Sequence, residues 1–277
     1  MRTKQEQNKV RRRLLYLWFP HFSIERHKRI EIDKRAKQDD FSGIIIIQDR
    51  AGRRVVIASC PLAFQMGVAV GLSLEDALAA CPSLLVFEAD LIADQLAIET
   101  LARWCGRYTP LVSIDKANKG LGNAGIWLDI TGCAHLFGGE ADLLNDIIAR
   151  LTAINWTAFG AISDTPGSAW AVARFSGGVT QLIAPGEQQA ALSELPLSAL
   201  RLPKNTVGDL SKVGLRKIGQ LMLVPRAPLR ARFGKNIRLR LDQALGIEKE
   251  TVSPQTLHSP YLARLVLLEP ISNSETI

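Results

Sequence analysis

The stretch that decides the fold is Ile126-Trp127-Leu128-Asp129-Ile130-Thr131-Gly132, an apolar run that ends at a Thr-Gly bend. Short apolar runs bounded by turn-forming residues are typical of β-strands. A second such run, residues 111–115, precedes it across a loop of Gly, Asn and Lys. The two runs predict a hairpin, which a helical pattern at 140–151 and a strand pattern at 157–163 follow.

Hairpins recur elsewhere in the chain. Residues 43–48 and 54–58 predict one across the turn-rich connection 49–52. The other elements predicted before residue 187 are a buried strand at 14–19, a basic helix at 24–37, a helix opened by Ser73, a strand at 84–87, a helix at 90–108, and a helix capped by Asp164 with Pro166 in its first turn. Because strands alternate with helices while hairpins recur, we predict an α+β fold with a mixed or antiparallel sheet.

The composition changes near residue 187. Residues 204–245 contain short amphipathic segments separated by glycines and prolines, which predict a small, basic, all-helical domain. Residues 251–277 hold three prolines around one β-like run, at 264–268, and are too few to bury a core of their own. We expect them to be a linker and the first strand of a domain that has been cut off.

Composition limits the class of protein. The 277 residues are 47% hydrophobic and 22% charged, which is ordinary for a globular protein of about two domains and excludes disorder. The longest apolar runs, such as residues 43–47, are shorter than the roughly 18 residues of a membrane-spanning helix. The charged N-terminus lacks a small-residue cleavage site, so we predict no signal peptide and no membrane contact, and a cytoplasmic location.

The cysteines and histidines show no metal-binding or disulfide pattern. There is no C-x-x-C, and no pair of histidines has ligand spacing. We therefore expect reduced thiols and no zinc site. The residues are Cys60, Cys81, Cys105 and Cys133, and His21, His27, His135 and His258.

The net charge of +7 is unevenly distributed. Residues 1–40 carry 12 Lys and Arg against 6 Asp and Glu, and residues 201–250 carry 12 against 4, so the rest of the chain is acidic. Such segregation is typical of a protein that faces a polyanion. Basic helix faces that merely keep the protein in solution would give the same count.

One glycine motif matches a nucleotide-binding fingerprint. Residues 120–125, Gly-Leu-Gly-Asn-Ala-Gly, have the spacing of G-x-G-x-x-G. That fingerprint must follow a strand and open a helix, whereas these glycines precede a strand-like run, so we interpret them as a hairpin loop. The sequence contains no P-loop, zinc-protease or serine-hydrolase motif.

Two carboxylates lie in the predicted second hairpin, Asp115 and Asp129. Strand-end carboxylates can hold Mg²⁺, but two-metal phosphoryl transfer needs at least two or three that converge. The ammonium group of the adjacent Lys116 is expected to repel a divalent cation at Asp115. Asp129 is expected to accept hydrogen bonds in the Thr131-Gly132 bend.

The order of these motifs resembles the palm and fingers of the Y-family translesion DNA polymerases. The motifs are residues 15–29, residues 55–71, Ser113-Ile114-Asp115, residues 127–132 and Leu136-Phe137-Gly138, and residues 195–245 are similar to the helical thumb. The resemblance is strongest to the ImuB-like branch. Its members commonly have Leu-Trp-Phe-Pro in the first strand and, in the palm, the twelve-residue motif found here at 128–139.

The resemblance covers roughly residues 12–277 and implies a domain order. It implies a basic N-terminal extension at 1–12, palm at 13–42, fingers at 43–88, palm again at 89–186, a helix-hairpin-helix thumb at 187–250, and a linker with the first strand of a truncated little finger at 251–277.

The same resemblance implies that the catalytic positions are degenerate. Trp18 stands where active members have the first metal-binding Asp, Asp115 is retained, and Lys116 replaces the Glu. Pro61 and Phe64 replace the Tyr and Arg that contact the incoming triphosphate. Ser23 stands at the aromatic sugar gate. We therefore expect no catalytic residues, no bound nucleotide and no metal cofactor.

The favoured hypothesis is a non-catalytic accessory protein in DNA repair and SOS-induced translesion synthesis, which binds primer-template DNA without sequence preference. The expected phosphate contacts are Lys212, Arg216, Lys217, Arg226, Arg230, Arg232, Lys235, Arg238 and Arg240. The resemblance implies a bacterial, nucleoid-associated protein. It also implies as partners an error-prone replicative-type polymerase, the sliding clamp and ImuA/RecA-like proteins, mostly through a missing C-terminal region. The alternatives are a residually active, Mg²⁺-dependent Y-family polymerase and a small-molecule α+β enzyme.

Overall fold

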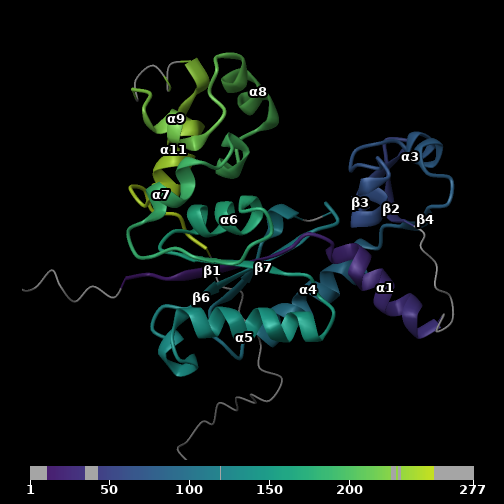
Figure 1. Cartoon of the computed structure of the whole chain (residues 1–277), viewed down its shortest axis with the longest axis horizontal. Helices are drawn as coiled ribbons and strands as arrows, with labels where there is room; N and C mark the ends of the chain where they lie inside the picture. The colour runs from purple at the N-terminus through teal and green to yellow at the C-terminus, as the bar shows by residue number, and fades with distance from the viewer. Residues whose placement is uncertain (1–10, 35–42, 119, 226–228, 230–231, 253–277) are drawn as a thin grey trace, which may run out of the picture.

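The computed structural model describes residues 11–34, 43–118, 120–225, 229 and 232–252 (Figure 1). It consists of two β-sheets and a group of helices, with the larger sheet in the middle. The predicted α+β class is confirmed. Within the ranges just given, none of the helices combines the length and the apolar composition that crossing a bilayer requires.

The helices carry the labels of Figure 1. The α-helices are α1 (Phe22–Lys34), α2 (Pro61–Gln65), α3 (Leu74–Ala80), α4 (Leu91–Cys105), α5 (Glu140–Ala153), α6 (Pro166–Phe175), α7 (Gln188–Ser193), α8 (Lys204–Lys212), α9 (Ile218–Met222) and α11 (Lys235–Leu245). The short 3₁₀ helices in the described part of the chain are η2 (Lys116–Asn118), η3 (Ala134–Phe137) and η4 (Leu197–Leu200).

The larger sheet has five strands in the order β5-β6-β1-β7-β8. β1 pairs antiparallel with both β6 and β7, and β8 is parallel to β7. The predicted hairpin around the glycine motif is confirmed as β5 and β6, and the glycines precede β6 as expected of a loop. The strands are β1 (Leu14–Phe19), β5 (Val112–Ile114), β6 (Ala124–Asp129), β7 (Phe159–Ser163) and β8 (Gln181–Leu182).

The side chains of β1 alternate between the two faces of this sheet, as the pleat of a strand requires. Leu15, Leu17 and Phe19 pack in a core with α4 and α5. Tyr16 and Trp18 belong to a second core on the opposite face, which contains α6. Because the strand is covered on both faces, its sequence is an unbroken apolar run.

The smaller sheet has three strands in the order β3-β2-β4 and lies beside α1 (Figure 1). β2 (Ile44–Arg50) and β3 (Arg53–Ser59) form the second predicted hairpin, and β4 (Leu85–Glu88) pairs parallel with β2. This sheet forms its own core with α2 and α3. Ser73 caps α3 as predicted, since its hydroxyl accepts a hydrogen bond from the amide of Asp76.

The helical region extends from α7 to α11 and shares a core with the larger sheet. Leu197, Leu221 and Ile237 belong to the same apolar cluster as Tyr16 and Trp127. Helices α6 and α11 pack closely at Gly167. A Cβ added to this glycine of α6 would lie 2.9 Å from the backbone of Ala244 in α11. The described residues of the predicted all-helical segment form α8, α9 and α11, and α11 packs directly on α6.

The prediction that Asp164 caps α6 is wrong. The cap is Thr165, whose hydroxyl accepts a hydrogen bond of 3.1 Å from the amide of Ser168. The Asp164 carboxylate instead pairs at 2.6 Å with the buried guanidinium of Arg13, which also pairs with Glu140. A buried cation needs carboxylate partners more than a helix terminus does. The helix predicted to reach residue 37 is described as far as Lys34, and the strand predicted at 264–268 lies outside the described residues.

Candidate functional site

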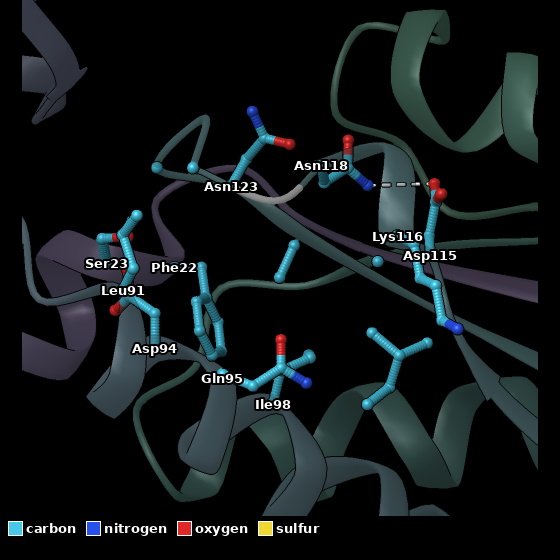
Figure 2. Close-up of a pocket in the computed structure, with 15 residues that line it drawn as sticks. Phe22, Ser23, Leu91, Asp94, Gln95, Ile98, Asp115, Lys116, Asn118 and Asn123 are labelled. Carbon is cyan, nitrogen blue, oxygen red and sulfur yellow. Dashed lines mark hydrogen bonds between the residues drawn. The ribbon is translucent and has the colours of Figure 1, made fainter. Parts of the chain in front are cut away.

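The carboxylate of Asp115 is the centre of a hydrogen-bond network between the larger sheet and α6. Its Oδ2 accepts bonds from the Tyr16 hydroxyl at 2.8 Å, the Asn118 amide at 2.9 Å and the Trp170 indole at 3.2 Å. Its Oδ1 accepts a bond from the backbone amide of Ala117 at 3.1 Å. Figure 2 shows the bond from Asn118. Both oxygens of Asp115 are therefore occupied by donors of the protein itself.

A glycine makes this network possible. A Cβ at Gly125 would lie 2.1 Å from the Tyr16 hydroxyl oxygen, so only glycine leaves room for that hydroxyl to reach Asp115. Burial and the neighbouring Asp115 carboxylate raise the pKa of Tyr16 far above its ordinary value. Tyr16 is therefore protonated at neutral pH and serves as a hydrogen-bond donor.

Trp18 lies on the same face of β1 and is stacked with a cation. The guanidinium carbon of Arg174, on α6, lies 5.0 Å from the ring centroid of Trp18 and 4.7 Å from that of Trp170. Arg174 also donates a hydrogen bond of 2.8 Å to the amide oxygen of Asn118. A guanidinium thus lies next to the position where the resemblance places the first metal ligand.

The expectation that Lys116 repels a cation at Asp115 stays a prediction. Figure 2 shows the Lys116 ammonium and the Asp115 carboxylate pointing in opposite directions. The hydrogen bonds to Asp115, and not its neighbour in sequence, occupy the oxygens that a metal would need. Across the described residues, no group of three or more His, Cys, Asp or Glu side chains is placed to hold a metal ion.

A pocket of about 320 Å³ adjoins Asp115 (Figure 2). Ser23 and Asp94 lie in its wall, and the Ser23 hydroxyl donates a hydrogen bond of 2.6 Å to the Asp94 carboxylate. The structure therefore brings Ser23, Asp115 and Lys116 to one pocket. Asp94 and Asn118, which also line it, were not predicted, because nothing local distinguishes a helix-surface Asp or a loop Asn.

Pro61 and Phe64 lie elsewhere, on α2. They line a separate, shallow groove with Val70 and His21, and the Phe64 side chain is 64% exposed. The structure does not place them in the wall of the Asp115 pocket.

The basic residues of the helical region are partly engaged by acids. Lys212 pairs with Asp209 at 2.9 Å, and Lys217 pairs with Glu194 at 2.6 Å. These pairs are exposed, so each is weak and can be exchanged for a phosphate. Arg216 is exposed as well.

The remaining predicted contacts lie on and before α11. Arg238 pairs with Asp242 at 3.1 Å, and Arg232 lies over the ring of Phe233. Lys235 is exposed at the first position of the helix. Arg226 and Arg230 lie outside the described residues.

Glu250 joins the helical region to the larger sheet. Its carboxylate pairs with Arg201 at 2.7 Å and with Arg240 at 3.3 Å, and its backbone carbonyl accepts a bond from Arg12 at 3.3 Å. Arg12 pairs in turn with Asp129 at 2.9 Å. Arg240, a predicted DNA contact, is therefore engaged by the carboxylate of Glu250.

Asp129 has the role predicted for it. Its Oδ1 accepts hydrogen bonds from the backbone amide and the hydroxyl of Thr131. The ion pair with Arg12 was not predicted, because the two residues are far apart in sequence.

The chain is similar to known proteins in sequence and in fold. The family model described as the impB/mucB/samB family matches residues 38–174. Protein ImuB of Caulobacter vibrioides is 44% identical over 212 residues, a match that covers 76% of this chain and 45% of that protein. DNA polymerase IV of Serratia proteamaculans is 29% identical over 239 residues, covering 83% of this chain and 65% of that protein. The chain thus spans less than half the length of the ImuB protein.

Solved structures share the fold. DinB from Sulfolobus solfataricus has a TM-score of 0.71 at 15% identity, over 87% of this chain and 69% of that one. An insertion ternary complex of Dbh DNA polymerase has a TM-score of 0.70 at 16% identity, over 87% of this chain and 69% of that one. Residues 38–174 therefore belong to the impB/mucB/samB family, and the fold of the chain is that of the palm and fingers of the Y-family DNA polymerases. The sequence of the chain is similar to the ImuB proteins.

Proposed function

We propose that this chain is a non-catalytic, polymerase-like protein that binds primer-template DNA during SOS-induced translesion synthesis. The observation that supports this most is the state of Asp115, the one carboxylate retained at the catalytic positions. Its Oδ2 accepts three hydrogen bonds from side chains of the same chain. The polymerase fold supports the DNA-binding part of the proposal.

The lack of catalysis follows from what phosphoryl transfer requires. Mg²⁺ needs several oxygen ligands in an octahedral arrangement, and the metal does most of the positioning in such reactions. At the three positions in question this chain has Trp18, the occupied Asp115, and Lys116 turned away from it. Pro61 and Phe64 offer no donor to a triphosphate.

The domain order belongs to the same proposal. Residues 13–42 and 89–186 would be the palm, 43–88 the fingers and 187–250 the thumb. In this arrangement the exposed cations of the thumb contact the phosphates of the duplex.

The proposed cellular role is recruitment in a bacterial cytoplasm, at the nucleoid. The matched ImuB protein is more than twice as long as the aligned region. The contacts with an error-prone replicative polymerase, the sliding clamp and ImuA/RecA-like proteins would then lie mostly beyond this chain.

Primer extension tests the catalytic part of the proposal. We expect no Mg²⁺-dependent incorporation on any primed template, with the Serratia DNA polymerase IV as the positive control. Extension that disappears in Asp115→Ala would support the residually active polymerase instead.

A double substitution tests which feature prevents catalysis. Trp18→Asp with Lys116→Glu restores two carboxylates but leaves the donors on Asp115 and the residues Pro61 and Phe64 in place. We expect the double variant to remain a poor polymerase in the same assay. Robust synthesis would show that Mg²⁺ can displace the hydrogen bonds to Asp115 and bind this carboxylate.

A further inference from the structure

Arg174 is a cation that has no acid partner among the described residues. In the described part of the chain it forms no ion pair, in contrast to Lys212, Lys217 and Arg240 of the thumb. Its only polar partner there is the amide oxygen of Asn118. Asn118 donates in turn to Asp115, so a neutral amide lies between the guanidinium and the carboxylate.

The guanidinium retains donors that can bind a ligand. Arginine has five N–H donors, and the bond to Asn118 uses one. The indole rings of Trp18 and Trp170 contact the guanidinium carbon within cation-π distance, and ring contacts do not consume N–H donors. No nitrogen of Arg174 is both buried and without a hydrogen-bond partner, so the nitrogens that do not bond to Asn118 have surface exposed to solvent.

The two tryptophans make the cation rigid. Arg174 is half-buried, and its stacking on Trp18 and Trp170 restricts the long side chain before any ligand arrives. A planar guanidinium that is fixed in this way suits the two oxygens of a phosphate. A lysine at the same position would offer a point charge without this fork.

We propose that Arg174 binds a phosphate group of the DNA backbone at the palm, without Mg²⁺. This rests on the proposed DNA-binding function and adds a palm contact to those of the thumb. The site lies on the face of the larger sheet that carries Tyr16 and Trp18, away from α4 and α5. Trp18 and Trp170 are positioning residues in this site.

The salt dependence of primer-template binding tests the proposal. Each phosphate contact releases about 0.9 of a counterion, so Arg174→Gln should lower the magnitude of the log K against log salt slope by about 0.9. Arg174→Lys keeps the charge and should keep the slope, while its affinity falls because the fork is lost. The matched control is Arg103→Gln, an exposed arginine on α4 behind the opposite face of the sheet, which should leave the slope unchanged.

A second measurement uses the unaltered chain and so does not depend on the folding of a variant. Phenylglyoxal modifies accessible arginines, and mass spectrometry locates the products. We expect primer-template DNA to protect Arg174 and not Arg103. Protection should persist in EDTA at constant ionic strength, because a guanidinium contact needs no metal.

The outcomes separate the two proposals. The palm contact would be overturned if Arg174→Gln left the log K against log salt slope unchanged, or if DNA did not protect Arg174 from phenylglyoxal. Either result would leave DNA binding by the thumb intact. Protection that requires Mg²⁺ would also overturn it. If the unaltered chain does not bind DNA at all, both proposals fail.

Discussion

The Asp115 network and the surface of the helical region show two different uses of polar side chains. At Asp115 the donors are fixed by the sheet and α6, and they fill the carboxylate. On the helical surface, Lys212 and Lys217 form exposed pairs with single acids. Buried polar groups are costly to leave unpaired, whereas exposed pairs contribute little and exchange readily. The oxygens of Asp115 are therefore occupied by donors of the protein, whereas the surface of the helical region is open to anions.

The largest loss of unfolding free energy is expected at Gly125, because the hydrogen bond from Tyr16 to Asp115 depends on this glycine. Gly125→Ala would place a methyl group 2.1 Å from the Tyr16 hydroxyl oxygen. Tyr16 would have to move and abandon Asp115, so we expect a loss of about 3 kcal/mol or more in unfolding free energy. Urea denaturation measures this loss of unfolding free energy. The control is Gly208→Ala in α8, where no atom lies within 4 Å of the new Cβ, and stability should be unchanged or slightly higher.

Removing one hydrogen-bond donor from Asp115 should lower the unfolding free energy by less than Gly125→Ala does. Tyr16→Phe deletes the hydroxyl that donates at 2.8 Å, and we expect a loss of about 1–3 kcal/mol. The matched variant is Tyr108→Phe, whose hydroxyl donates to Asp146. Asp146 keeps Arg150 as a partner at its exposed position, so the loss there should be smaller. Equal losses in thermal or urea unfolding would contradict the idea that a donor to the enclosed Asp115 contributes more than a donor to the exposed Asp146.

The next largest loss of unfolding free energy is expected at Glu250, which links the helical region to the larger sheet. Its side chain is 11% exposed and pairs with Arg201 and Arg240, so Glu250→Gln should cost about 1–2 kcal/mol. In the control, Glu194→Gln removes the partner of Lys217, whose pair is exposed, and should change stability by less than about 0.5 kcal/mol. Unfolding of both variants at low and high salt would reveal whether burial makes the difference.

The smallest change in stability is expected on the thumb surface. Replacing Lys212, Arg216 and Lys217 together by Ala should leave unfolding nearly unaltered. If all three contact phosphates, the magnitude of the salt slope for primer-template binding should fall by up to about 3. A slope identical to that of the unaltered chain would remove these residues from the DNA interface. On the basic helix α1, the exposed Lys28 would then be the next candidate, because Arg26 is buried and paired with Asp94 and Arg29 is stacked on Trp156.

Local patterns were sufficient for most of the elements. The run at residues 14–19, the hairpin glycines and the cap at Ser73 each predict their structure from neighbours in sequence, and each is confirmed. The cap of α6 could not be predicted in the same way. Asp164 and Thr165 are both good caps, and the choice between them was made by Arg13, a residue of the distant first strand.

The sequence by itself determined most of the strands and helices and the excess of Lys and Arg over residues 201–250, because these depend on residue type and local period. Only the tertiary structure decided what surrounds Asp115. Tyr16 of β1 and Trp170 of α6 donate hydrogen bonds to this carboxylate, and Arg174 of α6 stacks on Trp18 of β1. Side chains more than fifty positions apart become partners only when packing fixes their directions, and the local pattern of a chain carries no record of those directions.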